Sequence, residues 1–195
     1  MAITSIKTGS SFTNLQKYND FLAGNAAYNP SSFESIATVT VGAGGASSIS
    51  FSSIPSTYQH LQIRYFGRNT ADNNAAVYMT TNGDTGNNYS WHQVFGSGSS
   101  AGTQAFANQT YMSVGQESST ANVFDAHIID VLDYTNTNKN KTVRTLGGWE
   151  DNTQGRVFLR SGLWMNTAAI TTITLTPSSS NFAQYSSFAL YGIKG

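Results

Sequence analysis

The chain has 195 residues, 39% hydrophobic and 12% aromatic but only 10% charged, against roughly 25% charged residues in an ordinary soluble domain. Ten Lys and Arg residues balance ten Asp and Glu residues, so no basic block is present to attract nucleic acid. Cysteine is absent, which excludes disulfides, thiolate metal sites and a cysteine nucleophile. The composition predicts one domain with a hydrophobic core and a surface of uncharged polar groups, which suits a protein held in an assembly.

The N-terminal sequence contains no basic segment followed by an apolar run, so we expect no signal peptide. No segment approaches the ~20 consecutive apolar residues of a membrane span. We therefore expect no membrane attachment.

The first part of the chain has helical rather than strand periodicity. A capping-box sequence at Thr13 precedes apolar residues at helical spacing, which predicts a short helix over residues 14–23. Pro30 then interrupts the pattern. We therefore expect an N-terminal helical or extended attachment arm, residues 1–32, and a body, residues 33–195. The apolar residues of the arm that we expect to bind a partner are Phe12, Leu15, Tyr18, Phe21 and Leu22.

From residue 33 onward the period changes to two, which is typical of β-strands. Residues 35–41 and 48–51 flank a glycine-rich turn and predict a hairpin. The uncharged stretch 96–108 has no periodicity and predicts a surface loop, and residues 82–87 predict a hairpin turn with at most incidental ion binding. Further strands are expected near residues 61–65, 77–79, 89–95, 111–116, 123–134, 143–149, 157–165, 170–176 and 188–193.

About ten short strands with regular turn signals indicate an all-β fold. We expect a two-sheet antiparallel, jelly-roll-like β-sandwich. An immunoglobulin-like sandwich is the second choice, because that fold usually needs fewer strands than the sequence predicts.

Few residues suggest chemistry. His60, His92 and His127 lie on three different expected strands, each at a polar-face position, and form no metal-binding motif. We expect all three to be surface or groove residues without a catalytic role. The many serines form no nucleophile elbow, because the Gly-Ser run near residue 97 lacks the required strand-to-helix turn.

The carboxylates give one suggestive group. Trp149-Glu150-Asp151 joins an aromatic ring to two acids, as sugar-binding sites do, but we favour a strand end followed by a charged turn. Asp130 is expected to be partly buried on its strand. We therefore expect no enzyme activity, no metal and no cofactor, with a glycan depolymerase as a distant alternative.

Several segments resemble a group of virion proteins from tailed bacteriophages of aquatic bacteria, including cyanophages. The similarity lies in residues 33–38 (FESIAT), 51–64 (FSSIPSTYQHLQIR), 163–175 (LWMNTAAITTITL) and 188–194 (FALYGIK), and in residues 17–25 (KYNDFLAGN) of the arm. Members of this group are variously described as decoration, head-fibre or tail proteins. The resemblance implies a virion component and supplies no catalytic residues.

From the resemblance and the arm together we expect a capsid decoration or cement protein that docks on the shell through its N-terminal arm. The expected partners are the major capsid protein or other virion proteins, in a homo-oligomer with a trimer favoured, assembled in the host cytoplasm. The alternative is a tail or head fibre module that recognises host surface glycans. We do not expect the protein to bind nucleic acid or a membrane.

Overall fold

The computed structural model describes residues 32–195, and this part of the chain is all β. The expected helix at residues 14–23 lies outside the described residues. The strands are β1 (Phe33–Thr40), β2 (Ile49–Phe51), β3 (His60–Gly67), β4 (Ala75–Thr81), β5 (Tyr89–Gly96), β6 (Ala101–Gln109), β7 (Met112–Glu117), β8 (Asp125–Leu132), β9 (Lys141–Glu150), β10 (Gly155–Trp164), β11 (Ile173–Pro177) and β12 (Ser187–Ile193). The described residues contain no helix that is long and apolar enough to cross a membrane.

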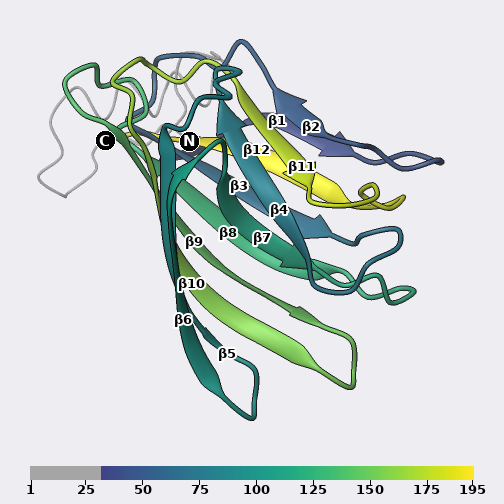
Figure 1. Cartoon of the computed structure of the whole chain (residues 1–195). Coiled ribbons are helices and arrows are strands. Elements are labelled where there is room, and N and C mark those ends of the chain that lie inside the picture. The colour runs from purple at the N-terminus through teal and green to yellow at the C-terminus, as the bar shows by residue number, and fades with distance from the viewer. Residues whose placement is uncertain (1–31) are drawn as a thin grey trace, which may run out of the picture. The chain divides into compact units, whose positions relative to one another are not determined.

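The strands form two antiparallel sheets, as expected from the sequence (Figure 1). The large sheet has eight strands in the order β1-β12-β3-β8-β9-β10-β5-β6, and the small sheet has four in the order β2-β11-β4-β7. The chain alternates between the sheets from β1 to β5, from β6 to β8 and again from β10 to β12. This repeated crossing is jelly-roll-like, with the β8–β9–β10 meander widening the large sheet.

The core lies between the two sheets and follows the expected alternation. In β3, Leu61, Ile63 and Tyr65 are buried, and in β5 Tyr89 and Trp91 point to the same side. They pack against apolar residues of the small sheet, which are Val77 and Met79 of β4, Met112 and Val114 of β7, and Ile173 and Leu175 of β11. Each sheet therefore buries one face, which leaves the other face of the large sheet available to partners.

Three sequence-based predictions of local structure are wrong. Residues 35–41 and 48–51 do not form a hairpin, because β1 pairs with β12 in the large sheet while β2 pairs with β11 in the small one. The turn at residues 82–87 joins strands of different sheets, so it is not a hairpin turn. The expected loop at 96–108 contains β6, which pairs with β5.

Candidate interaction surface

The outer face of the large sheet carries a straight row of apolar side chains. Ile128 of β8 lies opposite Leu146 of β9, which lies opposite Leu159 of β10, which in turn lies opposite Val94 of β5. We call these four residues the apolar row. Their exposed fractions are 38%, 55%, 52% and 50% in that order.

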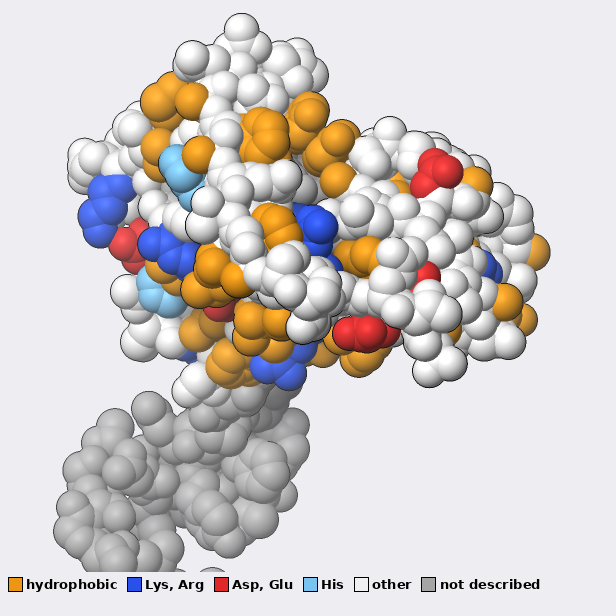
Figure 2. All heavy atoms as spheres, turned by 60° about the horizontal axis from the view of Figure 1, so that its bottom comes forward, with side chains coloured by type: hydrophobic (Ala, Val, Ile, Leu, Met, Phe, Trp, Pro, Cys, Tyr) orange, Lys and Arg blue, Asp and Glu red, His pale blue; other side chains and the backbone are white. Residues whose placement is uncertain are grey.

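An exposed apolar row is unusual at this position. In a sandwich the solvent face of an antiparallel sheet is normally polar, because only the inner face needs to be apolar. The neighbouring Phe66 and Val157 extend the apolar surface and are 56% and 60% exposed. In a space-filling view, hydrophobic side chains gather in patches beside Lys and Arg side chains (Figure 2). A contiguous exposed apolar patch of this kind marks an interaction surface.

A polar row runs beside the apolar row, two residues away from it on each of the four strands. Gln62, Asp130, Arg144, Ser161 and His92 lie opposite one another in sequence across β3, β8, β9, β10 and β5. Gln62 Nε2 donates to Asp130 Oδ1 at 2.7 Å, and Arg144 donates to Ser161 Oγ at 2.6 Å. These hydrogen bonds order the side chains, so the apolar row has a defined polar border.

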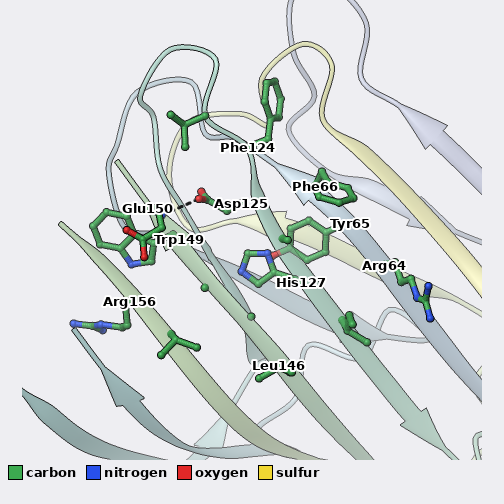
Figure 3. Close-up of a pocket in the computed structure, with 16 residues that line it drawn as sticks. Arg64, Tyr65, Phe66, Phe124, Asp125, His127, Leu146, Trp149, Glu150 and Arg156 are labelled. Atoms are coloured by element: carbon green, nitrogen blue, oxygen red, sulfur yellow. Dashed lines mark hydrogen bonds between the residues drawn. The ribbon is translucent and has the colours of Figure 1, made fainter. Parts of the chain in front are cut away.

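On its other side the apolar row opens into a hollow of about 780 Å³. Phe66, Phe124 and Leu146 are among the residues that line it, with Arg64 and Arg156 on opposite sides (Figure 3). The Arg64 guanidinium donates to Gln62 Oε1 at 2.7 Å. The hollow is therefore mostly apolar, with cationic groups at its margin.

Two glycines allow an aromatic stack beneath this hollow. The rings of Tyr65 and His127 are stacked with centroids 4.4 Å apart. A Cβ at Gly115 would collide with the Tyr65 hydroxyl, and a Cβ at Gly147 would collide with the His127 ring. Glycine at these positions is therefore required by the close approach of the rings.

A buried polar cluster adjoins the stack on the core side. Glu117 is fully buried, and its carboxyl oxygens have no hydrogen-bond partner among the described residues. Burial raises its pKa well above the usual range, and the nearby Asp125 raises it further. Burial also raises the pKa of Asp125 to about 6, although its carboxylate accepts from the N–H groups of Ser118 (2.5 Å) and Glu150 (3.0 Å).

Arg160 is buried next to this cluster, and its hydrogen bonds to other described residues are all to neutral groups. It donates to Gln93 Oε1 at 2.7 Å, to Ser113 Oγ at 2.8 Å and to the Gly115 carbonyl at 2.9 Å. Its guanidinium carbon lies 4.0 Å from the centroid of the Phe158 ring. Burial lowers the pKa of Arg160 to about 10. These contacts fasten β10, β5 and β7 together under the outer face.

The structure places the three histidines apart. His92 is exposed in the polar row, and His60 Nδ1 accepts from the Asp133 N–H at 2.9 Å. The expectation for His127 is wrong, because it is 2% exposed. Burial lowers its pKa to about 3, with the Arg160 charge contributing, so the ring is neutral inside the protein.

The carboxylates also occupy structural positions. Trp149 is buried, and Asp151 Oδ1 accepts from the N–H groups of Thr153 and Gln154 at 2.9 and 2.7 Å. The turn interpretation of this segment is therefore confirmed. Asp130 is partly buried, as expected. Within residues 32–195, no group of three or more His, Asp or Glu side chains is arranged to hold a metal ion.

The expected partner-binding residues of the arm, Phe12, Leu15, Tyr18, Phe21 and Leu22, lie outside the described residues. The apolar outer face of the large sheet was not predicted from the sequence. The signal available for it was the alternation in β8, which places Ile128 and Leu132 on one side and Asp125 and His127 on the other. Comparison with protein-family models, with curated proteins and with solved structures gave no significant match.

Proposed function

We propose that this chain is a structural protein of a tailed-bacteriophage virion, a capsid decoration protein that attaches to the major capsid protein or another shell protein. It acts without catalysis. The apolar row is the observation that carries the proposal, because its four side chains are exposed in register on four adjacent strands of the large sheet. The resemblance of the sequence to virion proteins supports the choice of partner.

The chemistry of the face fits a protein partner. Burying one exposed leucine contributes at most roughly 1.5–3 kcal/mol before ordering costs are subtracted. A single contact of this size gives weak binding, but repetition over a symmetric shell adds avidity. The polar row beside Ile128 and Leu146 supplies hydrogen-bonding groups at the border, where interfaces are normally polar.

The proposal predicts that Leu146→Ser combined with Leu159→Ser weakens attachment at least tenfold. Co-sedimentation of the purified chain with shells that lack it measures this directly. Both leucines are half exposed, so the fold is expected to survive. The matched control, Met165→Ser with Tyr185→Ser, changes two exposed apolar residues outside the row (46% and 70% exposed) and should bind normally.

Copy number in purified virions tests the location separately. Hundreds of copies per particle support a shell protein, and a few dozen or fewer support a tail component. Absence of the chain from virions, or unchanged attachment of the Leu146 and Leu159 variant, contradicts the proposal.

The hollow supports a second candidate function, a head or tail fibre module that binds host surface glycans. Phe66 and Phe124 line it beside Arg64, Arg156 and Glu150, and sugar sites combine aromatic faces with charged hydrogen-bonding groups. Titration with host polysaccharide fragments, followed by fluorescence of the wild type and of Arg156→Ala, distinguishes this candidate from shell attachment.

A further inference from the structure

Strand β6 is an unprotected edge of the large sheet. It lies last in the strand order and, among residues 32–195, pairs only with β5 (Figure 1). Its nine residues, AGTQAFANQ, are exposed or partly exposed along their whole length. They include no charged residue and no proline. The outward N–H and C=O groups of such an edge are a template for another strand.

The other three edges carry features that discourage pairing. At the opposite end of the large sheet, β1 contains Glu34 and a β-bulge between Ser35 and Ala37. In the small sheet β2 has three residues, and all six residues of β7 are buried. Charges, bulges, shortness and coverage are the usual protections of sheet edges. Residues 101–106 of β6 carry none of these features, because the register shift of this strand lies beyond Phe106, opposite Tyr89 and Trp91 of β5, where Asn108 has a positive φ. This unprotected stretch is where a partner strand would pair.

The side chains of β6 are suited to an antiparallel copy of the same strand. Towards the outer face the strand presents small residues, Thr103 and Ala105, which lie opposite Val94 and His92 of β5. On the other face Phe106 is 38% exposed and stacks on Trp91 with centroids 4.1 Å apart. Gly102 lies on that same face, where the Phe95 ring covers it.

We propose that β6 pairs with β6 of a second copy of this chain about a two-fold axis at Gln104. In this register Thr103 lies opposite Ala105 of the second copy, and Gly102 lies opposite Phe106 of the second copy. A large ring therefore meets a glycine, next to Phe95. A two-fold pair places identical strands side by side, so any charge on β6 would face its own copy; this strand has none. The two large sheets become continuous.

This inference is independent of the shell-binding proposal, because it concerns an edge and a self-contact. Thr103→Lys with Ala105→Lys places four cations together across the axis. The matched control, Thr38→Lys with Thr40→Lys, adds the same charge to exposed residues of edge strand β1. Sedimentation velocity of the full chains over a range of concentrations should show association weakened at least tenfold by the β6 change and unaltered by the β1 change. Circular dichroism should show both folded.

Cross-linking tests the register. Because the chain has no cysteine, Gln104→Cys introduces a single thiol that would face its copy at the axis. Oxidation should give a covalent dimer, while Thr38→Cys should not. The pairing would be overturned if the wild type is a monomer at all concentrations, or if association survives the β6 lysines. It would also be overturned if the β6 lysines abolish association but Gln104→Cys forms no cross-link. A trimer broken by the β1 lysines would overturn it as well.

Discussion

Glu117 carries a buried carboxyl group without a hydrogen-bond partner among the described residues. In the folded protein such a carboxyl group is protonated, because burial disfavours its charged form. Its folded-state pKa is raised above the ordinary value of 4.5. The folded protein therefore binds a proton that the unfolded chain releases, and this group stabilises the fold fully below about pH 4.5. The contribution is lost as the pH rises towards the folded pKa.

We predict that Glu117→Gln stabilises the protein at pH 8 and has little effect at pH 4. Each unit by which the folded pKa is raised corresponds to about 1.4 kcal/mol at high pH, and the amide has no charge to bury. Urea unfolding of both proteins between pH 4 and pH 8 measures the difference.

The comparison of two proteins in this experiment cancels the buried groups that do not interact with Glu117; the nearby Asp125, whose pKa is raised to about 6, is the group whose titration the substitution also changes. The lowered pKa of His127, about 3, has the opposite sign, since stability is lost as the pH falls from about 6.5 towards 3. That loss occurs equally in wild type and in Glu117→Gln. A pH-independent difference between the two would show that Glu117 is not protonated in the fold.

Lys141 is the second buried group with a testable role. Its ammonium group donates to the carbonyls of Asn136, Lys139 and Thr167 at 2.6, 2.8 and 2.9 Å. These bonds tie the β8–β9 turn to the segment after β10. The side chain is fully buried, so its loss leaves three carbonyl groups without a donor.

We predict that Lys141→Met lowers the free energy of unfolding by about 1–3 kcal/mol, measured by thermal or urea unfolding. Exposed Lys139→Met serves as the control, because its ion pair with Asp133 is at the surface and should matter little. Equal effects of the two changes would contradict the anchoring role of Lys141.

At the scale of elements, β8 is a strand that the sequence pattern predicted without indicating which of its faces is buried. Its outer positions include Ile128 and Leu132, whereas its inner positions include Asp125 and His127 beside Ile129. Hydrophobicity alone therefore assigns the wrong side to the core. The inner polar groups are accommodated by the glycines and the buried hydrogen bonds of neighbouring strands, which a single strand's pattern does not contain.

Strand β6 and the 35–51 segment show two further limits. Both faces of β6 are exposed, so no burial requirement imposes alternation, and its strand character comes from pairing with β5. The alternation near residues 35–41 and 48–51 correctly predicted β1 and β2. Their partners are β12 and β11, more than a hundred residues away, and local turn signals carry no information on such pairings. Where one face is fully buried, as in β3 and β5, the sequence predicted strand and core together.

At the scale of the whole molecule, the large sheet is twice as wide as the small one. The sandwich closes its core in the region where the two overlap, and the described core residues run from Val41 to Leu190. The body thus contains a core built from its own strands. We therefore predict that the arm contributes to attachment together with the apolar row, rather than to folding.

Deletion of residues 1–29 tests that assignment. We predict a soluble β domain whose unfolding midpoint shifts by less than about 4 °C, since 1 kcal/mol corresponds to roughly 2–4 °C for a chain of this size. The truncated chain should bind shells more weakly than the full chain, because Phe12, Leu15, Tyr18, Phe21 and Leu22 are removed while the apolar row remains. The chain that lacks only residues 1–11 keeps all five and should bind as the full chain does.

If removal of residues 1–29 instead unfolds the body, as shown by loss of the β-type circular dichroism spectrum, the arm belongs to the core. Normal shell binding by the truncated domain would leave attachment to the outer face of the large sheet alone.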